Sequence, residues 1–156
     1  MFVTDYTKHL LDHVKKIHFI GCGGSGMYPL IQILNAKGYV ISGSDVLDGS
    51  IIRYERELGV NVTLGHSADN VVGADMVVYS AAISKDNVEL NAAASYGIPT
   101  IERSVLLGYV SRLYKQNKCQ FTESDQSKVR KENLHTQQNI ERFLAQSNKT
   151  VALVDC

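Results

Sequence analysis

A glycine-rich segment near the start of the chain has the spacing of a phosphate-binding loop. It consists of Gly21, Cys22, Gly23, Gly24, Ser25 and Gly26. In a G-x-G-x-x-G loop, the first glycine permits the tight turn, the second lets the backbone approach a phosphate, and the third lets the helix pack on the strand. The helix N-terminus adds a partial positive charge, so we expect this loop to bind a diphosphate without a lysine or arginine.

A carboxylate follows the second predicted strand. Asp45 lies nineteen residues after Gly26, where this type of fold often places an acid that accepts hydrogen bonds from a ribose or a base. The segment 42–45 could instead form a turn in which Asp45 caps backbone amides, because Ser and Asp are common in turns. Glycine loop and carboxylate alone favour an NAD(H)-binding domain of an oxidoreductase or redox sensor.

Strands and helices alternate along the first 115 residues. The predicted strands cover residues 17–20, 39–43, 60–64, 75–79 and 99–101, and the predicted helices cover residues 27–37, 51–58, 87–96 and 104–115. An amphipathic segment predicts one more helix around residues 6–14. This alternation predicts an α/β fold, a Rossmann-like parallel sheet of about five strands with helices on both faces.

The composition changes after Lys115. All twelve glycines and both prolines lie at or before Gly108, whereas residues 116–150 are rich in Gln, Asn, Ser, Lys and Glu. We predict an N-terminal extension over 1–15, a Rossmann-like domain over 16–115 and a polar tail over 116–156. The tail is expected to be largely disordered or loosely helical, with a helix over about 128–146 and a short strand at 150–154 as its candidate elements. The alternative is an ordered helix that docks on the sheet through Ile140, Phe143 and Leu144.

Charge and cysteine content exclude several classes of function. Sixteen basic residues balance sixteen acidic ones, so the net charge gives no reason to expect nucleic acid or an anionic membrane as a partner. The longest apolar stretches are far too short to span a bilayer, and the charged start is not a signal peptide. Three cysteines without metal-type spacing predict free thiols in the cytoplasm, with no disulfide and no metal site.

Several short blocks together are more specific than the glycine loop. They are Ile17–Met27 (IHFIGCGGSGM), Ser42–Asp45, Gly65–Ser67, Tyr79–Ile83 and Gly97–Pro99. In order and spacing they resemble the opening domain of the ligases of the Mur family that join L-alanine to UDP-N-acetylmuramate. The resemblance covers about residues 15–115, roughly two thirds of the chain. A related family, which reattaches a recycled peptide to the same UDP-sugar, fits the glycine loop less well.

The resemblance implies a cytoplasmic enzyme of peptidoglycan synthesis. In such ligases ATP phosphorylates the lactyl carboxylate of UDP-N-acetylmuramate, and the alanine amine attacks the acyl phosphate. The first domain holds the UDP-sugar, the second binds ATP and magnesium, and the third closes over the amino acid. This sequence resembles only the first domain.

The same resemblance implies a set of ligand contacts. The loop 21–26 would face the diphosphate, Ser44 and Asp45 the uridine, and His66 and Ser80 the rim of the pocket, while Arg103 is a candidate anion contact. Cys22 only needs to be small. His66 could instead help Ser67 to cap the next helix, and Ser80 and Ser84 could simply start turns.

The sequence departs from the ligases after residue 115. No GxxxxGK[ST] motif occurs, and no glycine follows Gly108 with which to build one. We therefore expect that this chain binds UDP-N-acetylmuramate but does not ligate alone, and that ATP and Mg serve only the full-length enzyme. A truncated or frame-shifted ligase gene is the favoured account. The alternatives are a UDP-sugar-binding module, one part of a split enzyme whose partner is a separate ATP-binding ligase fragment, and a remnant whose pocket the tail blocks.

Overall fold

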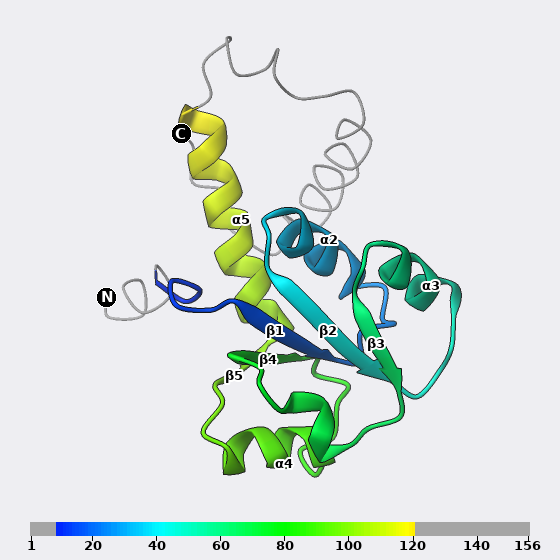
Figure 1. The fold of residues 1–156 in the computed structure, drawn as a ribbon. Helices are drawn as coiled ribbons and strands as arrows, with labels where there is room; N and C mark the ends of the chain where they lie inside the picture. The colour runs from blue at the N-terminus through cyan, green and yellow to red at the C-terminus, as the bar shows by residue number, and fades with distance from the viewer. Residues whose placement is uncertain (1–8, 121–156) are drawn as a thin grey trace. The chain divides into compact units, whose positions relative to one another are not determined.

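Five parallel strands form a single sheet (Figure 1). The computed structural model describes residues 9–120, and the side chains of residues 9–113. The strands are β1 (Lys16–Ile20), β2 (Val40–Asp45), β3 (Asn61–Leu64), β4 (Met76–Tyr79) and β5 (Thr100–Glu102), arranged in the order β3-β2-β1-β4-β5. The order reverses between β1 and β4, as in doubly wound sheets, which bind ligands beyond the carboxyl ends of their strands at such a point. The predicted Rossmann-like α/β fold is confirmed.

Helices cover the two faces of the sheet. Between the strands lie α2 (Tyr28–Ala36), α3 (Ser50–Glu57), the 3-10 helix η1 (Ala68–Val71) and α4 (Val88–Ser95), and α5 (Arg103–Gln120) follows β5. Figure 1 shows α2 and α3 on one face and η1 with α4 on the other. On the η1 and α4 face, Ile20, Val71, Val77, Ala92 and Ala93 form a buried apolar cluster that holds these helices against β1 and β4.

Most predicted elements lie within one or two residues of the observed ones, and the differences have local causes. Residues 9–13 form turns rather than the predicted opening helix, with the amides of Asp12 and Val14 bonded to the carbonyls three residues earlier. Asp75 was predicted to begin a strand, but its carboxylate accepts the amides of Lys15 at 3.0 Å and Lys16 at 2.9 Å. Its bonds thus tie the start of β4 to the start of β1.

The chain divides into two compact units, residues 1–106 and 107–156, with the division inside α5. The first unit contains the sheet and every predicted ligand contact. Of the second unit, the structure describes residues 107–120, which are helical, so the closing helix runs five residues beyond its predicted end at residue 115. The predicted helix over 128–146 and strand at 150–154 lie outside the described residues. Among the described helices, none has the length and hydropathy needed to cross a bilayer.

Candidate functional site

The glycine loop connects β1 to α2 and is tied to the end of β2. Gly21 has a φ of 78°, a left-handed conformation that favours glycine. The amides of Gly21 and Cys22 donate to the Ser44 carbonyl oxygen at 2.8 and 3.0 Å, and the Gly24 amide donates to the Gly21 carbonyl at 3.2 Å. These bonds hold the loop at the carboxyl edge of the sheet.

Only part of the loop is free to bind an anion. The Gly23 amide also has a partner, the carboxylate of Asp45, so all four amides from Gly21 to Gly24 are used within the protein. Among the described residues, no acceptor is found for the amides of Ser25 and Gly26. Ser25 is exposed and Gly26 half-buried. The capacity of the loop for a phosphate therefore lies in its last two amides.

The Arg103 guanidinium lies against the third loop glycine. A Cβ on Gly26 would stand 2.9 Å from Arg103 Nη1 and 3.1 Å from Cζ. The third glycine was predicted to let the helix pack on the strand; in the structure, the space beside it is taken by this guanidinium. Arg103 is half-buried at the start of α5, and no carboxylate within the described region pairs with it. Two free amides and a positive charge therefore lie side by side.

Asp45 makes the bonds expected of a turn residue. Its Oδ2 accepts the Gly23 amide at 2.9 Å, and its Oδ1 accepts the Leu47 amide at 3.0 Å. Oδ2 also fills the space where a Gly23 Cβ would lie, at 2.9 Å, which is the space that we expected a phosphate to approach. The ligand contact of Asp45 remains a prediction, and its visible role is to hold the loop and the turn after β2.

Cys22 is a packing residue inside the loop. Its side chain is fully buried, and a Cβ on Gly43 would come within 2.6 Å of Cys22 Cβ, which explains a glycine in the middle of β2. Burial, and then the nearby carboxylate of Glu55, raise the pKa of the Cys22 thiol far above its usual range. A neutral buried thiol is inert, and with its amide also bonded, Cys22 offers a ligand neither thiol nor amide.

Glu89, on α4, has a buried carboxylate that contacts side chains from β1, β2 and the β3–η1 connection. Glu89 accepts from Ser44 Oγ at 2.6 Å and lies 2.8 Å from His66 Nδ1 and 3.3 Å from His18 Nε2. Glu89, His18 and Ser44 are essentially inaccessible to solvent, whereas the His66 side chain is 20% exposed. The side chains of Ser44 and His66, both predicted to contact the ligand, are thus bound to a residue that sequence reasoning missed.

Glu89 is ionised at neutral pH in spite of its burial. Burial by itself raises the pKa of this carboxyl, but hydrogen bonds from His18, Ser44 and Asn70 outweigh it and hold the pKa at about 2. Several donors around one carboxylate satisfy its lone pairs, as a buried charge requires. The group therefore serves as a fixed acceptor beneath the site.

Ser80, the predicted rim residue after β4, and Ser84 both lie in turns. The Ser80 carbonyl accepts the Ile83 amide at 3.0 Å, and Ser84 Oγ accepts the Asp86 amide at 3.3 Å. These turns place Ile83 beside Gly21. A Cβ on Gly21 would lie 3.2 Å from Ile83 Cδ1. Ser67 caps η1 by accepting the Asp69 amide at 3.4 Å. His66 takes no part in this cap, because its Nδ1 is bonded to Glu89 and Ser44.

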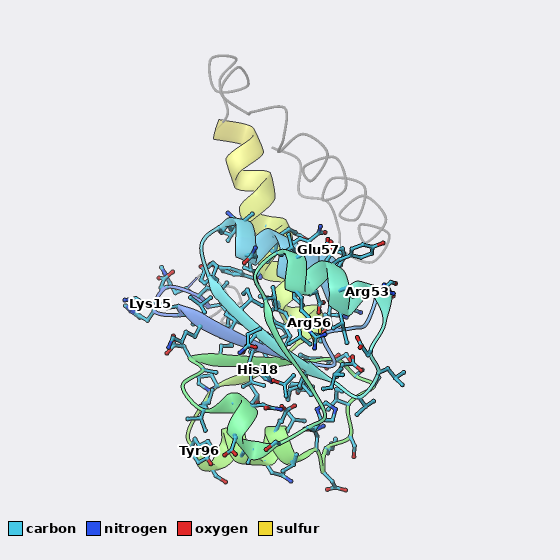
Figure 2. All side chains as sticks on the ribbon, turned by 45° about the vertical axis from the view of Figure 1, so that its right-hand side comes forward. Lys15, His18, Arg53, Arg56, Glu57 and Tyr96 are labelled. Carbon is cyan, nitrogen blue, oxygen red and sulfur yellow. The ribbon has the colours of Figure 1, made fainter. Side chains whose placement is uncertain are left out.

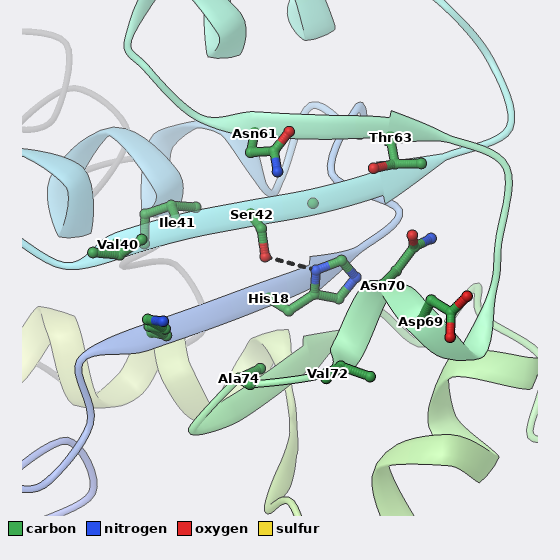
Figure 3. A pocket seen from close by; sticks show the side chains of 13 residues that line it. His18, Val40, Ile41, Ser42, Asn61, Thr63, Asp69, Asn70, Val72 and Ala74 are labelled. Carbon is green, nitrogen blue, oxygen red and sulfur yellow. Dashed lines mark hydrogen bonds between the residues drawn. The ribbon is translucent and has the colours of Figure 1, made fainter.

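A separate cavity of about 320 Å³ lies on the sheet face that η1 covers. Figure 3 shows His18 and Ser42 inside it, joined by a 2.8 Å bond between His18 Nδ1 and Ser42 Oγ, with Asn61 and Thr63 along β3. No residue of the glycine loop lines this cavity. It meets the candidate site through His18, which bonds Ser42 on one ring nitrogen and Glu89 on the other, and through Asn70, which also bonds Glu89.

His18 carried the strongest sequence signal among the residues that were missed. It interrupts the otherwise apolar and buried segment 17–20 of β1, and a polar side chain in such a segment must find a partner. Figure 2 shows it at the middle of the sheet. Glu89 gave little signal, because an acidic residue in the first turn of a helix is ordinary on any surface.

Comparisons with known proteins agree with this architecture. Residues 16–115 match the family described as "Mur ligase family, catalytic domain". The UDP-N-acetylmuramate-L-alanine ligase of Caldanaerobacter subterraneus subsp. tengcongensis is 45% identical over 105 residues, which are 67% of this chain and 23% of that protein. The corresponding ligase of a Sulfurihydrogenibium species is 48% identical over 99 residues, 64% of this chain and 22% of the relative.

Solved structures give the same picture. The UDP-N-acetylmuramate-alanine ligase of Thermotoga maritima superposes with a TM-score of 0.59 at 33% identity, over 66% of this chain and 23% of that one. A second solved structure is the UDP-N-acetylmuramate:L-alanyl-gamma-D-glutamyl-meso-diaminopimelate ligase of Neisseria meningitides. It superposes with a TM-score of 0.56 at 26% identity, over 64% of this chain and 31% of that chain. The chain thus spans less than a quarter of the length of the curated relatives it matches. With the strand order, the glycine loop and the matched residues in agreement, the chain belongs to the Mur ligase family.

Proposed function

We propose that the first compact unit binds the diphosphate of UDP-N-acetylmuramate at the glycine loop. The observation that carries the proposal is the pair of unused amides at Ser25 and Gly26 beside the Arg103 guanidinium. Backbone amides and a guanidinium are donors that suit phosphate oxygens, and each charge-assisted bond is strong. The relatives are named for a UDP-sugar substrate, which supports the identity of the nucleotide.

The sugar-binding role is one part of ligation. Attack on the lactyl carboxylate needs that group to be activated, and we propose that ATP and magnesium serve this step outside the region that matches the family. A separate ATP-binding ligase fragment is one source of that activity. On this account the chain binds the peptidoglycan precursor and leaves the precursor unchanged when no such partner is present.

Thermal unfolding of the full chain tests the binding. A ligand that binds only the folded state adds about 2.7 kcal/mol at a concentration a hundredfold above its Kd, so UDP-N-acetylmuramate should raise the melting temperature. Arg103→Met should weaken binding about tenfold or more, because a hydrogen bond to a charged group contributes about 1.5–3 kcal/mol. Arg53→Met, at an exposed arginine of α3 labelled in Figure 2, is the matched control and should bind normally.

Two results would contradict the proposal. One is an unchanged melting temperature at saturating UDP-N-acetylmuramate. The other is stabilisation by NADH without stabilisation by UDP-N-acetylmuramate, which would favour the NAD(H)-binding alternative.

A further inference from the structure

The hydrogen bonds around His66 determine which of its ring nitrogens carries a proton. His66 Nδ1 lies 2.8 Å from Glu89 Oε2 and 3.2 Å from Ser44 Oγ. An ionised carboxylate has no proton to donate. The single hydroxyl proton of Ser44 goes to Glu89 Oε2 at 2.6 Å, so Ser44 Oγ can only accept from His66. Both neighbours of Nδ1 are acceptors, and Nδ1 must therefore be protonated.

The other ring nitrogen is left without a partner. Within the described part of the chain, His66 Nε2 makes no hydrogen bond, and the side chain is partly exposed. A neutral imidazole that carries its proton on Nδ1 presents a lone pair on Nε2. In the neutral form of His66 the free nitrogen is therefore an acceptor, and its complement is an N–H group.

Ser44 connects His66 to the glycine loop. Its carbonyl accepts the amides of Gly21 and Cys22, while its hydroxyl lies between Glu89 and His66. The Gly65 amide donates to the Asp45 carbonyl at 2.8 Å, so the segment before His66 is also fixed to the end of β2. His66 thus lies at the same edge of the sheet as the loop, and ligands of doubly wound sheets bind beyond this edge.

Glu89 is itself held from its other side. His18 Nε2 lies 3.3 Å from Glu89 Oε1, and His18 Nδ1 lies 2.8 Å from Ser42 Oγ. Nε2 must carry the proton because Glu89 only accepts, and Ser42 then donates its hydroxyl proton to Nδ1 when the ring is neutral. The Glu89 amide also donates to Asn87 Oδ1 at 2.8 Å. Its carboxylate has little freedom to release His66.

We propose that Glu89 is a positioning residue that holds His66 in the tautomer with Nε2 as an acceptor, and that this acceptor selects uracil. Uracil carries a hydrogen on N3, whereas cytosine has a lone pair there, so Nε2 attracts the first and repels the second. The inference rests on the proposed binding of a UDP-sugar and specifies how its base is recognised.

The tautomer can be measured without any ligand. In the full chain, the nitrogen chemical shifts of the neutral His66 imidazole should report a protonated Nδ1 and a bare Nε2. Glu89→Gln replaces the acceptor with an amide that can also donate, so His66 should change to a mixture of tautomers. Glu57→Gln, at an exposed position of α3, should leave the shifts unchanged. A wild-type spectrum with the proton on Nε2 would overturn the inference.

Nucleotide affinities measured by calorimetry test the base contact. The wild-type chain should bind UDP about tenfold or more tightly than CDP or N3-methyl-UDP, because a site built around a hydrogen bond rejects analogues that lack its donor. In His66→Ala and Glu89→Gln the preference should fall to within a few-fold, and combining them should add little. The N3-methyl comparison needs no variant and holds even if Glu89→Gln unfolds.

The outcomes separate the two proposals. Equal wild-type affinity for UDP, CDP and N3-methyl-UDP would overturn the base contact and leave diphosphate binding standing. An unchanged preference in a folded His66→Ala chain would do the same. If neither UDP nor UDP-N-acetylmuramate binds, the proposed function and the base contact both fail.

Discussion

At the scale of single residues, the glycines of the loop matter through what fills the space beside them. The space beside Gly21 is taken by Ile83, that beside Gly23 by Asp45, and that beside Gly26 by Arg103. Only the last neighbour carries a charge suited to an anion. A side chain on Gly26 would therefore disturb the proposed phosphate contact more than the fold.

Gly26→Ala should weaken UDP-N-acetylmuramate binding about tenfold or more while leaving the melting temperature nearly unchanged. The new Cβ would lie 2.9 Å from Arg103 Nη1, and the flexible end of that arginine can move away without disturbing the backbone. Loss of its charge-assisted bonds sets the size of the effect.

Gly49→Ala is the matched control for this change. A Cβ on Gly49 has no neighbour within 4 Å, and the backbone φ of −116° suits alanine. Calorimetry on both variants should separate them. Equal affinities for Gly26→Ala and the wild type would mean that the Arg103 position is irrelevant to binding.

The sequence pointed to the glycine loop and Arg103 as candidate site residues, but not to Glu89, which is bonded to Ser44 and His66. The glycine spacing and Arg103 after β5 follow from local patterns of the βα unit. Glu89 is bonded to His18, 71 positions away, and to His66, 23 positions away, so only the assembled sheet brings them together. An acidic residue in the first turn of a helix has the same local sequence pattern whether its side chain is exposed or buried. The sequence alone therefore did not reveal the role of Glu89.

At the scale of elements, α3 brings a carboxyl group into the core beside the loop. Glu55 is fully buried on this helix, and neither of its carboxyl oxygens has a hydrogen-bond partner among the described residues. Burial raises the pKa of Glu55 to about 7, the Cys22 thiol lowers it in part, and the Asp45 carboxylate raises it further. The folded protein therefore holds a proton on Glu55 that the unfolded chain loses at lower pH.

This proton makes the stability of the fold fall as the pH rises. The folded state binds more protons than the unfolded state between about pH 4.5 and 7, so the free energy of unfolding should decrease across this window and level off above it. The full loss is about 3 kcal/mol, since each unit of pKa shift corresponds to about 1.4 kcal/mol. Glu89, with a pKa of about 2, contributes the opposite dependence and only below about pH 4.5.

Glu55→Gln should remove this decrease, as measured by urea unfolding from pH 4.5 to 8. Glu57 lies on the same helix but is exposed, so Glu57→Gln should keep the wild-type pH profile. The histidines are the same in the wild type and both variants, so their titration does not affect the comparison. A Glu55→Gln profile parallel to the wild type would show that the buried carboxyl is already ionised in the folded state.

Element boundaries followed from the sequence where turn chemistry was clear. Gly38, Gly59 and Gly97 have φ values of 94°, 88° and 69°, and each follows a helix within two residues of its end, where a glycine commonly ends a helix. The prediction of an opening helix was wrong over residues 9–13, because the apolar spacing of this segment is equally compatible with turns. The 3-10 helix η1 was not predicted, since four residues carry no periodic signal.

At the scale of the whole molecule, the sheet places the two parts of the proposed site together. The glycine loop follows β1, and Arg103 follows β5, on the two sides of the point where the strand order reverses. The sequence predicted alternating strands and helices, and right-handed crossovers in a parallel sheet leave few arrangements for them. The family match at residues 16–115 covers both parts, although relatives such as the Caldanaerobacter ligase are more than four times as long as the aligned segment.

The most direct measurement is an amide chemical-shift titration of the full chain with UDP-N-acetylmuramate. The largest changes should occur at the amides of Ser25 and Gly26, the two in the loop without an acceptor, with smaller changes at Gly21 and Gly23, whose amides are already bonded. The Arg103 side-chain signals should shift at the same ligand concentration. Unperturbed Ser25 and Gly26 amides at saturating UDP-N-acetylmuramate would contradict the account.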